Sequence, residues 1–353
     1  VAFGMIGASL SGVTFISLPG TVATDSFSYF QVVLGYTVGY AVIGLILLPL
    51  YYRLNLTSIY SYLESRFGKY SYKTGASFFL LSRIVGSSFR LFLVANVLQL
   101  ILFDELGVPY YFTVSATIFL IWLYTFRSGI KTVVWTDTLQ TFFMLLSLGV
   151  TLIVVSDELG ITAGGMINHL SESGLTKIFF FEDWKSSDHF IKQFLSGAFI
   201  AIVMTGLDQD MMQKNLTCRN LKEAQKNMFS FTIVLTVVNM MFLILGVLLT
   251  QYADLSGIDA IKDELFPAIA TGGELGIGVA ILFILGLIAA AYSSADGTLT
   301  ALTTSFSIDI LNIEKSYEEA KQMKIRKQIH ITISILFIAV MLIFKYAIAD
   351  KSV

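Results

Sequence analysis

Long apolar stretches alternate with short polar ones along most of this chain. An α-helix needs about 20 mainly apolar residues to cross the hydrocarbon core of a bilayer, so each apolar stretch predicts one crossing. The pattern predicts nine transmembrane spans, at residues 1–20, 30–52, 75–103, 110–126, 134–156, 190–208, 227–251, 275–307 and 328–348.

Three of these spans depart from a uniform apolar helix. The first is rich in glycine and serine, the fourth is short, and the sixth ends in polar residues. Glycine and serine weaken a helix at membrane depth and allow backbone carbonyls to face a cavity. Interrupted helices of this kind are typical of membrane transporters, whereas a tightly packed, unbroken helix is the alternative for the first span.

Basic residues concentrate in every second loop, at 53–73, 127–131, 214–226 and 315–327. The positive-inside rule places these loops in the cytoplasm, so the first span runs from the inside to the outside. The two long loops on the opposite side, 157–189 and 252–274, carry amphipathic patterns. These patterns predict short surface helices, and plain connectors are the alternative.

The composition agrees with a membrane protein. Hydrophobic residues make up 55% of the 353 positions and charged residues only 14%, whereas soluble domains carry about a quarter charged residues. A net charge of −2 gives no reason to expect a nucleic-acid partner. The single cysteine excludes an internal disulfide, and the three histidines lie too far apart in sequence to indicate a metal site.

Few ionisable residues lie inside the predicted spans, and such residues usually mark a transport pathway or an internal ion pair. Asp137 begins the fifth span, and Asp296 lies within the eighth. Arg83 and Arg90 are seven residues apart in the third span and therefore share one helical face. Two further acids, at 208 and 210, end the sixth span, where an interfacial position is equally consistent with the pattern.

The eighth span is unusually rich in hydroxyl side chains, with Ser293 and Ser294 next to Asp296. Close helix packing requires small residues, but it does not require two hydroxyls beside a carboxylate. Hard cations prefer several oxygen ligands, which these side chains and the carbonyls of a broken helix could supply. The pattern therefore favours a cation site.

Four local motifs resemble the sodium:solute symporter family, which includes sodium/glucose, proline and sialic acid transporters. They are Ser-Gly-Val-Thr-Phe-Ile-Ser-Leu-Pro-Gly at 11–20, Ser-Gly-Ile-Lys-Thr-Val-Val-Trp-Thr-Asp-Thr-Leu-Gln at 128–140, Gly-Leu-Asp-Gln-Asp-Met-Met-Gln-Lys at 206–214 and Ala-Ala-Ala-Tyr-Ser-Ser-Ala-Asp-Gly-Thr-Leu-Thr-Ala at 289–301. Each motif is weak alone, but their order and spacing cover nearly the whole chain.

The resemblance implies an all-α, polytopic, LeuT-like fold: two inverted five-helix repeats whose first and sixth core helices are broken. Residues 1–156 would form the first repeat, 157–189 an extracellular loop with short helices, and 190–353 four helices of the second repeat. The family's tenth core helix and its flanking helices have no counterpart here, and the chain begins at Val1 inside an apolar stretch. We therefore expect a truncated chain.

The resemblance also implies where sodium binds. The family's common site maps onto the backbone carbonyls of Gly7, Leu10 and Ala290 and onto the hydroxyls of Ser293 and Ser294. Some members bind a further sodium ion at an acid that corresponds to Asp137. The hydroxyl partners of that acid are replaced here by Asp296 and Gly297, so this is either a second sodium site or a proton site.

The substrate pocket implied by the resemblance lies at the break in the first span. Its predicted lining comprises Ser11, Thr14, Tyr29, Gln31, Arg83, Arg90 and Met204. Met204 replaces the aromatic gate of the sugar transporters, and Leu235 replaces their lysine, which disfavours a neutral sugar. An arginine can bind a carboxylate through two hydrogen bonds, so the pocket favours an anion such as a sialic acid.

The resulting prediction is a sodium-coupled symporter in the plasma (inner) membrane that imports a small organic solute by alternating access. Sodium is the expected ion, and the lipid bilayer and the solute are the expected partners. A proton-coupled transporter of the same fold and a sodium-gated sensor or channel are the alternatives. An enzyme is not expected, because no histidine lies at membrane depth and the hydroxyls around Asp296 suit ion binding better than aspartyl catalysis. No feature of the sequence sets an oligomeric state.

Overall fold

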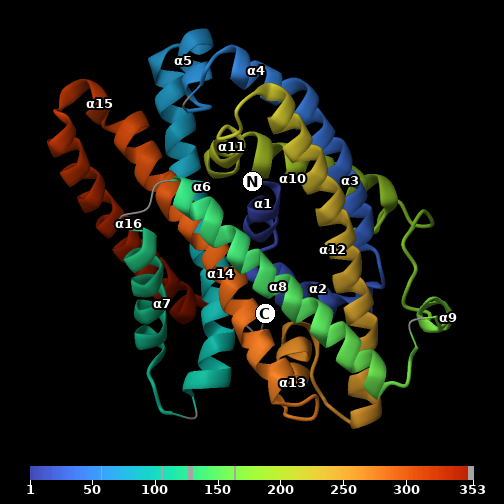
Figure 1. Cartoon of the computed structure of the whole chain (residues 1–353). Helices are drawn as coiled ribbons and strands as arrows, with labels where there is room; N and C mark the ends of the chain where they lie inside the picture. Colours follow the sequence, from blue (N-terminus) through green and yellow to red (C-terminus); the bar gives the residue numbers. More distant parts are fainter. Residues whose placement is uncertain (57, 105, 126–129, 163, 349–353) are drawn as a thin grey trace.

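A computed structural model describes residues 1–56, 58–104, 106–125, 130–162 and 164–348, without the side chains of residues 124, 130–132, 294 and 315. Every regular element in these ranges is a helix, as the sequence predicts. The helices form one bundle with α1 and α2 at its centre (Figure 1).

The long helices follow the apolar stretches of the sequence, and several of them change to a wider π-helical turn near one end. They are α3 (Tyr29–Val42) with η1 (Ile43–Leu47) and α4 (Leu48–Arg53), α6 (Lys69–Leu98) with η2 (Gln99–Phe103), α7 (Tyr110–Thr125), α8 (Ile130–Glu158), α12 (Leu221–Ser256), α14 (Ile277–Ser305) with η5 (Phe306–Ile310), and α16 (Glu319–Ile348).

Two further apolar segments are bent at short breaks. The first segment consists of α1 (Ala2–Ser9) and α2 (Gly12–Asp25), whose axes differ by 63°. The second consists of α10 (Phe190–Ala201) with η3 (Ile202–Gly206), followed by α11 (Gln209–Asn215) at 71°. These bends lie in the first and sixth predicted spans, the two that a LeuT-like fold breaks.

The predicted spans can be matched to helices one by one. In the described part, six helices are long and apolar enough to cross a membrane, and the two bent pairs bring that number to eight. The remaining predicted span, the short fourth one, corresponds to α7, whose apolar part covers Tyr110–Leu123. Short helices occupy the connections: α5 (Ser61–Phe67), α9 (Met166–Glu172), η4 (Lys262–Glu264), α13 (Leu265–Thr271) and α15 (Ile313–Ser316).

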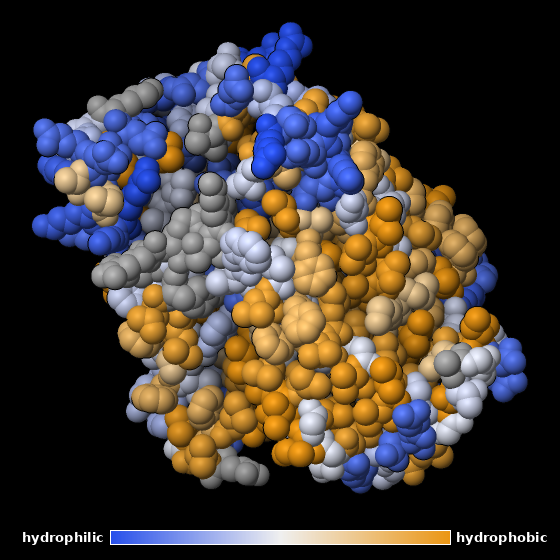
Figure 2. All heavy atoms as spheres, in the orientation of Figure 1, coloured by the Kyte–Doolittle hydropathy of each residue, from blue (hydrophilic) through white to orange (hydrophobic). Residues whose placement is uncertain are grey.

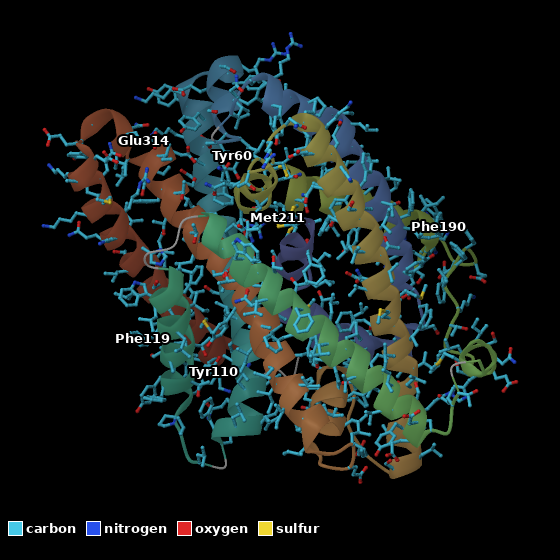
Figure 3. The ribbon with its side chains drawn as sticks, in the orientation of Figure 1. Tyr60, Tyr110, Phe119, Phe190, Met211 and Glu314 are labelled. Carbon is cyan, nitrogen blue, oxygen red and sulfur yellow. The ribbon has the colours of Figure 1, made fainter. Side chains whose placement is uncertain are left out.

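The surface shows which part of the molecule faces lipid. A broad hydrophobic band covers the body of the bundle, and a hydrophilic cap covers the end that carries α5 and α15 (Figure 2). Large apolar side chains such as Leu45, Ile153 and Ile335 are more than half exposed. Phe119 of α7 lies at the periphery and Glu314 at the polar end, whereas Met211 of α11 lies inside the bundle (Figure 3). Hydrophobic surface on this scale requires a lipid environment, so this is an integral, multi-pass membrane protein.

Glycines bring the backbones of α3 and α10 into direct contact. A Cβ atom added at Gly35 would lie 2.1 Å from the carbonyl oxygen of Phe194, and one added at Gly197 would lie 2.1 Å from that of Val32. Small residues permit this approach between membrane helices. The broken helix α10 is thus held tightly against α3.

An aromatic cluster fixes the second half of the first bent segment. Phe15 of α2 packs against Phe242 of α12, Phe266 of α13 and Phe283 of α14, with ring centroids 5.3–5.8 Å apart. All four rings are fully buried. This cluster anchors α2, so the break that precedes it has a defined position in the bundle.

Candidate functional site

The break between α1 and α2 exposes backbone carbonyls inside the bundle. Leu10 leaves the helical conformation with φ −80° and ψ 89°, and Ser11 begins α2 by accepting a hydrogen bond from the Thr14 amide at 3.5 Å. The last carbonyls of a helix lack the amide donors of a following turn. Within the described part, no backbone amide donates to the carbonyls of Gly7 or Leu10. Both are therefore able to bind a cation.

The structure places Ser293 of α14 directly beside this break. A Cβ atom added at Gly7 would lie 3.0 Å from Ser293 Oγ and 2.3 Å from Thr141 Oγ1 of α8. Ala290 lies buried one turn earlier on α14. The structure therefore brings Gly7 and Ser293, two of the predicted sodium ligands, together, and the side chain of Ser294 lies outside the described residues.

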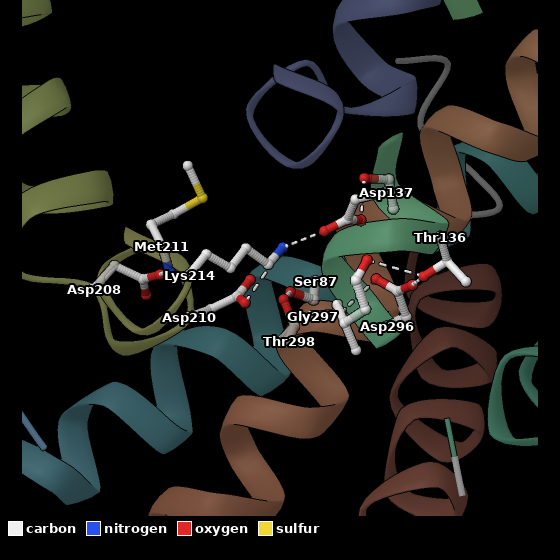
Figure 4. Close-up of polar contacts among 12 residues, drawn as sticks. Ser87, Thr136, Asp137, Asp208, Asp210, Met211, Lys214, Asp296, Gly297 and Thr298 are labelled. Atoms are coloured by element: carbon white, nitrogen blue, oxygen red, sulfur yellow. Dashed lines mark hydrogen bonds and ion pairs between the residues drawn. The ribbon is translucent and has the colours of Figure 1, made fainter. Parts of the chain in front are cut away.

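Asp137 of α8 is completely buried and uses both carboxylate oxygens. Its Oδ1 accepts a hydrogen bond from Ser293 Oγ at 2.7 Å, and its Oδ2 lies 2.8 Å from Lys214 Nζ of α11. The same ammonium group lies 3.5 Å from Asp210 Oδ1 (Figure 4). A buried ion-pair network therefore joins α8 to the second broken helix.

Asp296 of α14 is also fully buried but has other partners. Its Oδ1 accepts from the Gly297 amide at 2.5 Å, and its Oδ2 accepts from Thr136 Oγ1 at 3.3 Å (Figure 4). Asp137, Asp296 and Gly297, the three residues predicted to form a second ion site, are thus close together, but Lys214 lies among them.

A cavity of about 450 Å³ adjoins the break, a volume typical of small-molecule sites. Six of the seven predicted pocket residues line it: Ser11, Thr14, Tyr29, Arg83, Arg90 and Met204. The sequence did not predict several further polar lining residues, among them Tyr36, Thr205 and Asn239. Tyr29 and Tyr36 lie two turns apart on the same face of α3, and their hydroxyls are 3.0 Å from each other.

Gln31, the seventh predicted pocket residue, lies away from the cavity lining. Its amide nitrogen donates to the carbonyl of Asp188 at 2.9 Å, and its oxygen accepts from the amide of Phe180 at 3.2 Å. The side chain is completely buried. Gln31 therefore holds the connection before α10 against α3.

The two arginines of α6 have different surroundings. Arg83 Nε donates to Asp208 Oδ2 at 2.6 Å, and only 12% of the arginine side chain and 2% of the aspartate side chain are exposed. Arg90 lines the cavity, and no hydrogen bond or ion pair joins it to another residue of the described part. Arg90 is therefore the arginine available to a ligand in the cavity.

Lys214 lies where the sequence did not predict it. Its charge predicts a residue in a cytoplasmic loop, but it lies in α11 with 1% of its side chain exposed. Asp208 and Asp210 are likewise buried inside the bundle. The spacing of Asp210 and Lys214, four residues apart on one helix, was the available signal for a paired rather than a solvated lysine.

Comparisons with known proteins agree with this geometry. The model of the sodium:solute symporter family matches residues 1–352. The sodium/sialic acid symporter NanT of Aliivibrio fischeri is 26% identical over 95% of this chain, and the sodium/sialic acid symporter SiaT of Proteus mirabilis is 26% identical over 94%. The chain spans about two thirds of the length of these relatives, 66% and 67% respectively.

A solved structure shows the same fold. It is the substrate-bound, outward-open state of a Na⁺-coupled sialic acid symporter, with a TM-score of 0.85 and 21% sequence identity. The match covers 99% of this chain and 74% of the other. It confirms the LeuT-like fold that the sequence motifs predict.

Proposed function

Because the chain belongs to the sodium:solute symporter family, we propose that it is a sodium-coupled symporter that imports a small organic anion across the inner membrane. The observation that carries the proposal is the contact between the break in the first span and Ser293 of α14, beside a cavity that contains Arg90. Ion site and solute site are then adjacent, as coupling between them requires.

The sodium ion would bind between α1 and α14. The carbonyls of Gly7, Leu10 and Ala290 and the hydroxyls of Ser293 and Ser294 supply five oxygen atoms, the ligand type that a hard cation prefers. Ser293 now donates its hydrogen to Asp137, which leaves its oxygen lone pairs available for a cation. Bound sodium would join the two helices and stabilise one conformation of the pocket.

The solute would bind with its carboxylate at Arg90. This guanidinium is partly buried at the cavity and lacks a described partner, and a bidentate carboxylate matches its geometry. Ser11, Thr14, Tyr29 and Met204 line the remaining space. The two relatives named as sialic acid symporters make a sialic acid the first solute to test.

Alternating access follows from the two breaks. In inverted-repeat transporters one group of helices rocks against another around a fixed site near the middle of the membrane. Residues 1–156 and 190–353 are the proposed repeats, with a broken helix at the start of each. This activity needs none of the paired catalytic groups of an enzyme, so we propose transport without chemical conversion.

Uptake by reconstituted full-length protein tests the proposal. Labelled sialic acid and simpler carboxylates are offered to proteoliposomes under an inward sodium gradient or an equal potassium gradient. We expect accumulation with sodium only and a loss of this sodium-driven accumulation in Ser293→Ala. Uptake should stay normal in Ser334→Ala, which removes a buried serine hydroxyl of α16 that bonds only within its own helix.

Two further variants test the anion site. Arg90→Gln should abolish carboxylate uptake, whereas Arg90→Lys should raise KM and retain part of the rate, because lysine keeps the charge but loses the bidentate contact. Sodium-independent uptake that follows a proton gradient would contradict sodium coupling and support the proton-coupled alternative. Non-saturable sodium current without solute accumulation would indicate a channel.

A further inference from the structure

Lys214 occupies an unusual place for a positively charged side chain. It lies inside the bundle with 1% of its side chain exposed, 2.8 Å from Asp137 and 3.5 Å from Asp210 (Figure 4). A buried ammonium group has lost the hydration that water would provide, so acidic partners must hold it there. Asp137 is the nearer of the two and belongs to a different helix.

The same position is where the family resemblance implies a second sodium ion. That site needs the carboxylate of Asp137 and hydroxyl ligands from α14, at the positions of Asp296 and Gly297. Here neither position offers a hydroxyl. The hydroxyl ligands on the α14 side are therefore lost, and only the Asp296 carboxylate remains there as an oxygen donor.

Gly297 explains how the lysine fits. A Cβ atom added at this residue would lie 2.7 Å from Lys214 Nζ and 2.7 and 2.9 Å from the two carboxylate oxygens of Asp210. Any side chain, including the small hydroxyl of serine, would therefore push the ammonium and its acid away. The absence of a side chain at Gly297 therefore both removes a possible ligand and leaves the space that the Lys214 ammonium occupies.

The acids around this point are already engaged. Asp137 contacts Ser293 through one oxygen and Lys214 through the other, and Asp296 accepts hydrogen bonds from Gly297 and Thr136. A sodium ion at Asp137 Oδ2 would meet an ammonium group 2.8 Å from that oxygen and would gain no ligand from it. The residues present do not fit a second sodium ion.

We propose that the Lys214 ammonium is a resident cation that replaces the second sodium ion, so that this protein binds a single sodium ion, at the break of the first helix. The inference rests on the proposed sodium coupling and adds its stoichiometry. A tethered cation cannot leave with the solute. One sodium ion and one monovalent anion then cross together, and the cycle transfers no net charge through its cargo.

Equilibrium binding of ²²Na⁺ to the purified full-length protein tests this stoichiometry without a transported solute. Wild type should bind one ion per chain at saturation, and Ser293→Ala should bind none. Two ions in wild type would overturn the inference and leave sodium coupling intact. No bound ion in wild type would instead contradict the proposed sodium coupling, and the inference with it.

A double variant tests the role of the lysine directly. Lys214→Met with Gly297→Ser removes the tethered cation and restores a hydroxyl near Asp137, so we expect saturation to rise to two ions per chain. Lys214→Met with Gly297→Ala, which has the same bulk at both positions but adds no hydroxyl, serves as the matched control, with one ion expected. A double variant that elutes as a folded monodisperse species yet binds one ion would overturn the inference. If it does not fold, the wild-type count decides the question.

Discussion

The contact of Gly7 with α8 and α14 makes a quantitative prediction for sodium affinity. In Gly7→Ala the new methyl group would lie 2.3 Å from Thr141 Oγ1, whereas ordinary contact begins near 3.4 Å. Thr141 is completely buried and its hydroxyl donates to the carbonyl of Asp137 at 2.7 Å, so it cannot simply turn away. Helix α1 must therefore retreat by about 1 Å, the difference between these two separations.

The retreat separates the carbonyls of the break from Ser293. Overpacking a well-packed interior typically costs about 1–3 kcal/mol. The sodium-free protein can relax this strain by letting α1 move, but bound sodium draws α1 and α14 together again. Most of the cost should therefore appear as weaker sodium binding, by roughly 5- to 150-fold at about 1.4 kcal/mol per factor of ten.

The assay is a sodium titration of thermal stability on purified protein, which gives the apparent Kd for wild type and variant. Gly149→Ala is the matched control, since it adds the same methyl group to α8 at a point with no neighbouring atom within 4 Å. Thr141→Ala in the Gly7→Ala background should restore affinity by removing the clashing oxygen. An unchanged Kd in Gly7→Ala, or an equal loss in Gly149→Ala, would refute the reasoning.

Three other perturbations have clear expected outcomes. Asp208→Asn leaves the buried Arg83 without its acid, and thermal melting should show a loss of about 3 kcal/mol in stability; an unchanged melting temperature would contradict the importance of this pair. Gly20→Ala would place a methyl group 2.0 Å from the carbonyl oxygen of Lys262, a backbone clash that should abolish a monodisperse peak in size-exclusion chromatography. Burial raises the pKa of the Cys218 thiol, so alkylation at pH 7 should be slower than for a free thiol and should accelerate at a higher pH than for a free thiol; labelling as fast as that of a free thiol at pH 7 would exclude this environment.

The spans and their breaks could be predicted because they depend on local sequence. A stretch such as 227–251 is apolar wherever it lies, and the Gly-Ser pattern before Gly12 weakens a helix by its own conformational preference. The hydroxyl pair beside Asp296 is a local signal of the same kind, and the cation site that it predicts stays a prediction. Motif resemblance then supplied the fold and the residues at the break.

Partner choice could not be predicted in this way. Lys214 looks like any basic loop residue until α11 is known to lie beside α8, and Gln31 looks like a pocket residue until the connection at 180–188 is seen to use its amide. The two arginines of α6 are indistinguishable by spacing. Only packing pairs Arg83 with Asp208 and leaves Arg90 at the cavity without a partner in the described part.

The backbone contact of α3 with α10 limits how this protein can be recombined with its relatives. Each helix presents bare glycine to a carbonyl of the other, at Gly35 and at Gly197, so neither surface tolerates a partner of different shape. A chimera that exchanges only one of these helices would place a helix of different surface shape against the glycine of the other. The two helices are far apart in the sequence, yet a recombinant protein has to take both from the same parent.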